Sequence, residues 1–285
     1  MNFGEFQNGK AQQPLPQSLA THEAEIAHFA DLCTRTCNRI LKLLALGLEI
    51  PPDFFTTRHD PHQGPTGSIL RYLYYPSISS PSTATYKHDV DVRAGAHSDY
   101  GSITLLFQRP GQPGLEILPP AGTDNNNASS SNSSDNNSTN WAPVPVQPNQ
   151  QPGAAEEESK EGEYAFPPIL VNIGDLLSYW TDGLLKSTVH RVVFPLLEQR
   201  APSPQDRYSI VFFCHPRDTT ELVPVPSEVV AAYRRQRQMV QGGEGDERVG
   251  FGGGAGALQP GKRALTAYEH LMSRLAATYG ERKEA

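Results

Sequence analysis

The sequence has little of what marks secreted, membrane-spanning or nucleic-acid-binding proteins. Only three of its 285 residues are cysteines, which is too few for a disulfide framework. No apolar run reaches membrane-spanning length, and the first residues lack the charged and apolar parts of a secretory signal. The net charge is −7 and no basic stripe is present, which argues against a nucleic-acid partner. We therefore expect a soluble, cytoplasmic protein that binds neither nucleic acid nor membrane.

What the sequence does contain is a series of short strand patterns between helical patterns. Apolar residues recur at threes and fours from Thr21 to Gly47, which predicts an amphipathic helix. Ser227 can cap a second helix that runs to about Met239. Between these helices, runs of β-branched and aromatic residues predict strands. The predicted strands cover residues 68–75, 102–107, 114–117, 168–172, 188–194 and 207–214.

The last helix has the clearest start signal, because Thr266 and Glu269 form a capping box. Its spacing predicts one apolar face made of Leu265, Tyr268, Met272, Leu275 and Tyr279. The strand at 207–214 is almost wholly apolar, which is typical of a strand buried on both faces. Several short strands between flanking helices predict a mainly β fold, a double-stranded β-helix or cupin-like jelly-roll barrel.

The composition divides the chain into three segments and one insert. We expect an N-terminal helical support segment at 1–67, the jelly-roll domain at 68–218 and a C-terminal helical segment at 219–285. Residues 119–163 are polar and of low complexity, so most of this insert is predicted to be disordered. Within it, Trp141 to Val146 can form one short strand.

His97 and Asp99 form the first chemical motif, H-x-D. In extended backbone, residues two apart point to the same side, so both groups could reach one ion. His190 is the natural third ligand, since it alternates with apolar residues and points into a core or cavity. Two His and one carboxylate are the ligand set of non-haem Fe(II) oxygenases. Taken singly, each motif also fits an ordinary surface residue or a hydrogen-bonded core histidine.

Arg207 and Ser209 form the second motif, at the start of the apolar strand. They face the same way, and an unpaired buried guanidinium would be very costly. Its partner is either a carboxylate of the protein or a carboxylate of a ligand, which Arg binds through two parallel bonds. Together with a metal triad, the pair fits a ligand with a carboxylate at one end and metal-binding oxygens at the other. A 2-oxo diacid has this form.

Six stretches carry a resemblance to a known family. The chain resembles the Fe(II)/2-oxoglutarate-dependent dioxygenases, in the isopenicillin-N-synthase-like branch and its fungal members. Together the stretches cover most of 20–118 and 164–285. They are LRYLYYP (70–76), RAGAHSDYGSITLLFQ (93–108), GLEIL (114–118), VNIGDLLSYWTDGLLKSTVHRV (171–192), RYSIVFF (207–213) and LTAYEHLMSRLAATYG (265–280).

The resemblance implies the cofactors and the role of each site residue. It implies Fe(II), 2-oxoglutarate as cosubstrate and O2, with oxidative decarboxylation of 2-oxoglutarate coupled to hydroxylation or desaturation of a small organic substrate. Such a protein is expected to be a monomer of secondary metabolism. The implied iron ligands are His97, Asp99 and His190, and the implied 2-oxoglutarate residues are Arg207, Ser209 and Tyr75.

The chain also departs from the family pattern. Leu73 stands where relatives have Asn, and the matched pattern starts part-way through the family's N-terminal region, so we expect an uncovered sheet edge and an incomplete cavity wall. Three alternatives remain open. One is an oxidase of the same branch in which Arg207 and Ser209 hold a substrate carboxylate. Another is an inactive remnant that acts as a binding module. A zinc hydrolase is weaker, because it gives no reason for the Arg207–Ser209 pair.

Overall fold

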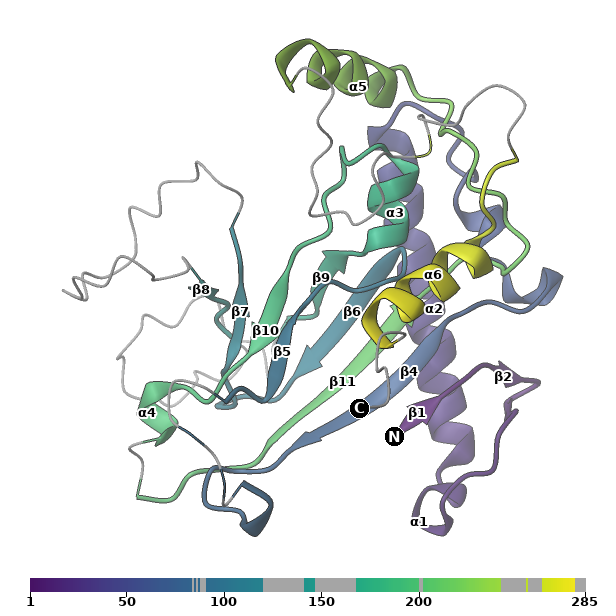
Figure 1. Cartoon of the computed structure of the whole chain (residues 1–285). Helices are drawn as coiled ribbons and strands as arrows, with labels where there is room; N and C mark the ends of the chain where they lie inside the picture. Colours follow the sequence, from purple (N-terminus) through teal and green to yellow (C-terminus); the bar gives the residue numbers. More distant parts are fainter. Residues whose placement is uncertain are drawn as a thin grey trace, which may run out of the picture.

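The structure is a computed structural model that describes residues 1–83, 85, 87, 91–119, 141–146, 168–199, 202–241, 255 and 263–279. Two antiparallel sheets with flanking helices form a jelly-roll fold (Figure 1). Residues of both sheets line one cavity between them. Among the described helices, none is both long and apolar enough to cross a membrane.

The larger sheet has five strands in the order β1-β4-β11-β6-β9. Arg207 pairs with Tyr75 and Phe213 pairs with Ile69, so β4 and β11 run side by side along their length. This pairing carries the residues of the second motif alongside Tyr75. The strands are β1 (Asn2–Phe3), β4 (Ile69–Tyr75), β6 (Ile103–Gln108), β9 (Leu170–Ile173) and β11 (Arg207–Cys214).

The smaller sheet has four strands in the order β5-β10-β7-β8. The pairing of its edge strand β5 with β10 sets His190 opposite His97, although 93 positions separate them in the sequence. The strands are β5 (Ala94–His97), β7 (Leu115–Ile117), β8 (Ala142–Pro143) and β10 (His190–Val192). A separate hairpin pairs β2 (Phe6–Gln7) with β3 (Lys10–Ala11).

The long helix α2 (Glu23–Gly47) packs on the outer face of the larger sheet (Figure 1). Phe29 on α2 meets Phe107 on β6 edge to face, with ring centroids 5.0 Å apart. Its buried side includes Cys33, Cys37 and Leu41. The other helices are α1 (Gln17–Ala20), α3 (Asp175–Trp180), α4 (Leu196–Gln199), α5 (Glu228–Gln241) and α6 (Ala267–Tyr279), with short 3-10 turns at Thr56–Arg58, Pro61–Gln63 and Pro81–Thr83.

Most predicted elements are confirmed within a residue or two, including the caps. Ser227 Oγ accepts from the Val230 amide, and the Thr266 and Glu269 side chains each accept from the other's backbone amide. The predicted short strand at 141–146 is present as β8. The rest of the insert at 119–163 lies almost entirely outside the described residues, and the three segment boundaries stay predictions.

Two expectations are wrong in detail. Tyr268 is 50% exposed and Met272 37% exposed, so the predicted apolar face of α6 is not its buried side. His270, with no exposed surface, and Ala267 are buried instead. The strand β11 is buried on both faces only in part, because Tyr208 is 40% exposed.

The N-terminal residues 1–18 have no sequence period, yet they form β1, β2 and β3. Phe3 is fully buried and meets the Tyr72 ring at 5.0 Å. Asn2 and Phe3 pair with Arg71 and Leu70 on β4, so these two residues of β4 have a strand neighbour on both sides. One buried aromatic side chain is enough to fix such a short strand, but it leaves no repeating pattern in the sequence.

Candidate active site

His97, Asp99 and His190 come together at one end of the cavity. One ligand atom of each residue lies within 4.8 Å of the others. His190 Nε2 lies 3.8 Å from Asp99 Oδ1, and the two imidazole rings are 4.3 Å apart between centroids. In the described part of the chain, this is the one cluster of three or more such side chains with metal-binding geometry.

The backbone orients both imidazoles. His97 Nδ1 lies 2.7 Å from the carbonyl oxygen of Gly95, and His190 Nδ1 lies 3.0 Å from that of Thr188. A carbonyl oxygen only accepts, so each Nδ1 carries the proton and each Nε2 keeps a free lone pair. The Nε2 lone pairs of His97 and His190 are therefore free to bind a metal ion that lies next to Asp99.

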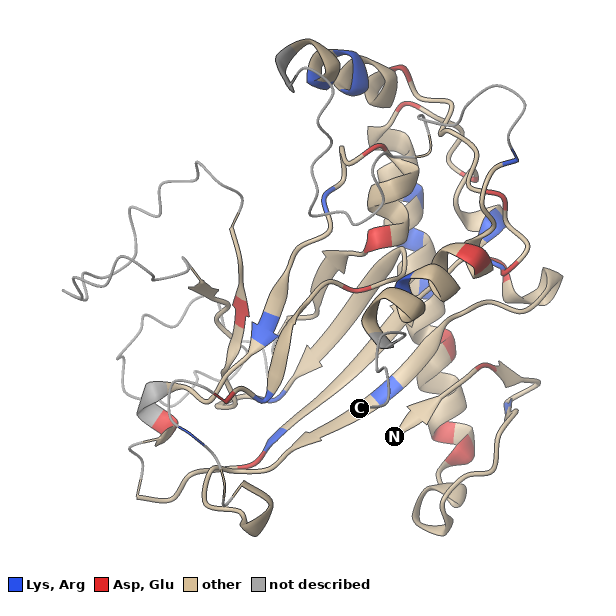
Figure 2. Cartoon of the chain, in the orientation of Figure 1, with Lys and Arg blue, Asp and Glu red and all other residues tan. Residues whose placement is uncertain are grey.

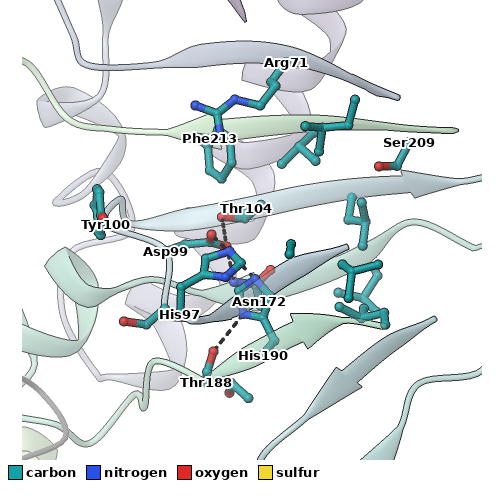
Figure 3. A pocket seen from close by; sticks show the side chains of 18 of the residues that line it. Arg71, His97, Asp99, Tyr100, Thr104, Asn172, Thr188, His190, Ser209 and Phe213 are labelled. Atoms are coloured by element: carbon teal, nitrogen blue, oxygen red, sulfur yellow. Dashed lines mark hydrogen bonds and ion pairs between the residues drawn. The ribbon is translucent and has the colours of Figure 1, made fainter. Parts of the chain in front are cut away.

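Asp99 is oriented by two neighbours on the larger sheet. Its Oδ2 accepts from Thr104 Oγ1 and from Asn172 Nδ2, both at 2.8 Å (Figure 3). The other oxygen, Oδ1, faces His190. Asp99 is only 6% exposed, so without a cation this carboxylate would be a poorly compensated buried charge. The donor set and its orientation fit a divalent metal ion.

The way Asp99 reaches the site differs from the expected one. The strand β5 ends at His97, and Asp99 lies in the loop that follows it. The amide of Asp175 donates to the Asp99 carbonyl at 2.7 Å and so holds this loop against α3. The convergence of His97 and Asp99 therefore depends on a tethered loop and not on strand alternation alone.

Arg207 and Ser209 point into the same cavity from β11, as predicted. Arg207 is 2% exposed, yet no carboxylate lies within ion-pair distance of it in the described part of the chain. Its Nη2 donates to Gln108 Oε1 at 3.2 Å, while its Nε has no partner. Burial lowers the pKa of the Arg207 guanidinium, and the nearby cation Arg93 lowers it further. A cation left in this state fits a site for an anionic ligand.

Tyr75 stands beside Arg207. The Arg207 Cζ lies 5.4 Å from the centre of its ring, and burial raises the pKa of the Tyr75 hydroxyl, so it stays a neutral donor. Arg93 is not available to bind an anionic ligand, because it pairs with both carboxylate oxygens of Glu198. The cavity between the two sheets has a volume of about 870 Å³. That volume is large enough for a 2-oxo diacid and a second small molecule.

Several residues that support the site were not predicted. Thr104 and Asn172 orient Asp99, and Gln108 orients Arg207. Their only sequence signal is that polar side chains at 104 and 108 interrupt the apolar cavity-facing positions of β6. Which carboxylate or guanidinium they touch depends on strand neighbours that no local pattern specifies.

Comparison with known proteins agrees with this geometry. Residues 66–216 match the 2OG-Fe(II) oxygenase superfamily. A UPF0676 protein of Schizosaccharomyces pombe is 36% identical over 210 residues, which is 74% of this chain and 51% of that protein. The chain belongs to the 2OG-Fe(II) oxygenase superfamily. The cofactors of this family are Fe(II) and 2-oxoglutarate.

Two further relatives show the extent of the match. Validamycin A dioxygenase of Streptomyces hygroscopicus is 30% identical, across 75% of this chain and 46% of that protein. The crystal structure of a full-length Neurospora crassa protein in complex with alpha-KG superposes with a TM-score of 0.61 at 25% identity, covering 96% of this chain and 64% of that one. The chain therefore spans about half the length of the curated superfamily relatives it matches.

Proposed function

We propose that this chain is a non-haem dioxygenase that couples oxidative decarboxylation of 2-oxoglutarate to hydroxylation or desaturation of a small organic substrate. The observation that carries the proposal is the triad of His97, Asp99 and His190, whose ligand atoms lie within 4.8 Å of one another beside an unpaired, buried Arg207. His97, Asp99 and His190 bind Fe(II). The relative crystallised with alpha-KG favours this reaction over an oxidase that does without 2-oxoglutarate.

The residues proposed to bind 2-oxoglutarate hold the carboxylate that lies far from the metal. Arg207 receives the carboxylate far from the metal through a charge-assisted pair of hydrogen bonds. Ser209 Oγ, 3.5 Å from Arg207 Nη1, adds a third donor, and the neutral Tyr75 hydroxyl is placed to add a fourth. The near end of the ligand then lies toward the triad. The arrangement holds the cosubstrate by both ends, so its orientation is fixed before O2 reacts.

The residues that orient Asp99 and the apolar walls of the cavity also support the reaction. Thr104 and Asn172 both donate to Oδ2 of Asp99, which would leave Oδ1 for the metal. The cavity walls are mainly apolar, which would favour oxidation of a bound organic substrate over reaction with water once iron and O2 are present. The iron supplies the O2 chemistry when bound. The protein supplies orientation and a mainly apolar site.

The substrate of such an enzyme is a small molecule, and we place the protein in the cytoplasm as a monomer of secondary metabolism, without a nucleic-acid or membrane partner. The test of activity is succinate formation from 2-oxoglutarate in the presence of Fe(II) and O2. We expect succinate from the wild-type chain and none above background from Asp99→Ala. Equal succinate from both proteins would contradict the proposal.

A further inference from the structure

The strands of the two sheets carry few charged side chains, and most of their length is tan in Figure 2. Apart from histidine, their described sequences hold four charged residues. Arg191 and Glu116 neutralise each other across neighbouring strands at 2.7 Å. Arg207 is assigned to 2-oxoglutarate above. Arg71 on β4 is the charge that remains without an explanation.

Arg71 faces the cavity and is paired with no carboxylate of the described residues. Its Nε donates to the amide oxygen of Asn2 at 2.7 Å, which fixes the side chain but leaves its charge uncompensated. The guanidinium carbon lies 5.0 Å from the centre of the Phe213 ring. Figure 3 shows the guanidinium group extended above Phe213, away from Ser209. Arg71 is partly exposed, so a ligand in the cavity can reach its two terminal nitrogens.

Phe213 connects this cation to the triad. It pairs with Thr104 across β11 and β6, and Thr104 donates to Asp99. Arg71 itself pairs with Val211, four residues along β11 from Arg207, so a strand length of about 13 Å separates the two guanidinium residues along the sheet. The two arginines therefore serve different parts of the cavity. A 2-oxoglutarate held by Arg207 leaves Arg71 free.

The charges of the loaded cavity are not balanced without a further anion. Fe(II), Arg207 and Arg71 bring four positive charges, while Asp99 and 2-oxoglutarate bring three negative ones. Asp99 is the only carboxylate among the described lining residues, so the protein itself supplies no compensation. Water compensates part of the charge of the partly exposed Arg71, and a substrate with one negative charge would compensate the part that faces the apolar cavity.

We propose that Arg71 and Phe213 form a substrate subsite that selects small organic acids, with the carboxylate on Arg71 and the apolar body across Phe213 toward the triad. This inference rests on the proposed function, because it assigns Arg207 to 2-oxoglutarate. The apolar body fits the cavity walls, which are mainly aliphatic. They include Leu73, Leu106, Leu115, Ile117, Leu170 and Val192.

The test is binding of acid and amide pairs to the loaded protein. The full chain is loaded with Zn(II) and 2-oxoglutarate, which gives a diamagnetic complex that does not turn over. The probes are 3-phenylpropionate, indole-3-acetate and octanoate, each beside its primary amide, and binding is measured by saturation-transfer NMR and calorimetry. We expect the best acid to bind at least about tenfold more tightly than its amide, as a charge-assisted bond predicts.

Variants of the two subsite residues test whether the preference for acids over amides depends on Arg71. Arg71→Gln should bind acid and amide equally, Arg71→Lys should keep part of the preference, and Phe213→Leu should weaken acid and amide alike. Arg109→Gln is the matched control, since Arg109 also stands over an aromatic ring, that of Tyr208, but does not line the cavity. Arg71→Lys keeps the charge, so it answers the question even where the neutral variant is poorly folded.

The outcomes separate this inference from the proposed function. No preference for acids in the wild type, no binding of any acid, or an unchanged preference in Arg71→Gln would overturn the subsite. Acids that compete with 2-oxoglutarate would also overturn it, because they would occupy the Arg207 site. An Arg71-dependent preference in a protein that binds no 2-oxoglutarate would uphold the subsite and contradict the proposed function.

Discussion

Arg274 on α6 donates to the carboxylate of Asp175 at 2.7 Å, and both side chains meet at Ser98. Ser98 stands between His97 and Asp99. Its Oγ donates to Asp175 Oδ2 at 3.0 Å and lies 3.4 Å from Arg274 Nη2. The last helix is thus tied to the segment between two of the proposed iron ligands.

Replacing Arg274 by Met should loosen this loop. We expect the affinity for Fe(II) to fall about tenfold or more, since groups that orient ligands commonly have effects of this size. Stability should also fall by about 3 kcal/mol, because the change leaves the buried Asp175 carboxylate without its cation. Metal titration and thermal unfolding measure the two effects. Arg263→Met, which breaks the exposed pair with Glu269, serves as control. Lower stability with unchanged metal affinity would show that the tie is structural only.

The hydrogen bond from Thr104 to Asp99 makes a sharper prediction, because it can be removed without changing shape. Thr104→Val should lower Fe(II) affinity by about tenfold to a hundredfold, and Thr104→Ser, which keeps the hydroxyl, should stay near wild type. Equilibrium dialysis under anaerobic conditions gives both values. Equal affinities for the Val and Ser variants would exclude a role for this hydroxyl in orienting Asp99.

Arg207 should affect 2-oxoglutarate and leave the metal alone. Arg207→Met removes the cation that receives the distal carboxylate, so we expect 2-oxoglutarate binding to weaken by about a hundredfold, on the scale of lost charged hydrogen bonds. Fe(II) binding should change little, because Arg207 contacts none of the triad residues. A variant that loses metal and 2-oxoglutarate together would point to a collapsed cavity instead.

His59 predicts a pH dependence of stability. It is 3% exposed, and its ring nitrogens lie 2.7 Å from the Phe55 carbonyl oxygen and 2.9 Å from Ser102 Oγ. Burial lowers the pKa of His59 to about 4. The unfolded chain, with an ordinary histidine pKa near 6.5, therefore binds more protons than the folded one between about pH 6.5 and 4. The stability that neutral His59 contributes is fully present above about pH 6.5 and is lost as the pH falls from there toward about 4.

The expected loss from this one histidine between pH 7 and pH 5 is about 2 kcal/mol. Urea unfolding at several pH values should show a shallower slope for His59→Gln than for the wild type. Burial also lowers the pKa of His215 to about 4 and that of His270 to about 3, so the slope should decrease in this variant and not vanish. An unchanged slope would mean that His59 is not buried neutral.

The packing of α2 on the larger sheet is tested by two leucines of one helix. Leu41 has no exposed surface, while Leu43 is 68% exposed. Leu41→Ala should cost about 2–5 kcal/mol of unfolding free energy because it leaves a cavity. Leu43→Ala should stay within about 0.5 kcal/mol of wild type. Similar losses from both would contradict the orientation of the helix.

The parts predicted well from sequence are those with a local signal. The capping box at Thr266 predicts the start of α6, and the apolar period predicts α2, because both signals lie within a few turns of the chain. The motifs at His97 and Arg207 stand out because such polar side chains are uncommon in strands. That His190 joins His97 and Asp99 is confirmed by the geometry; the alternation around His190 made it a candidate, and the family resemblance selected it. The roles of these residues in binding remain predictions.

The parts that were missed depend on which segments become neighbours. Asn172 reaches Asp99, and Arg274 reaches Asp175, because β9 and α6 lie against the H-x-D loop, and a local window of sequence contains neither pair. Tyr268 and Met272 satisfied the helical period but stayed exposed, since a short helix buries only the side that its connections allow. Arg71 sat within a recognised stretch, yet its unpaired charge became visible only once its neighbours were known.

The central claim is that one site holds a metal through the triad and 2-oxoglutarate through Arg207. Anaerobic calorimetric titration of 2-oxoglutarate into the full chain, with and without Fe(II), tests it most directly. We predict one 2-oxoglutarate per chain, bound much more tightly when Fe(II) is present, with this metal dependence lost in His190→Ala. Binding of equal strength without metal, or metal-dependent binding that survives in His190→Ala, would contradict the account.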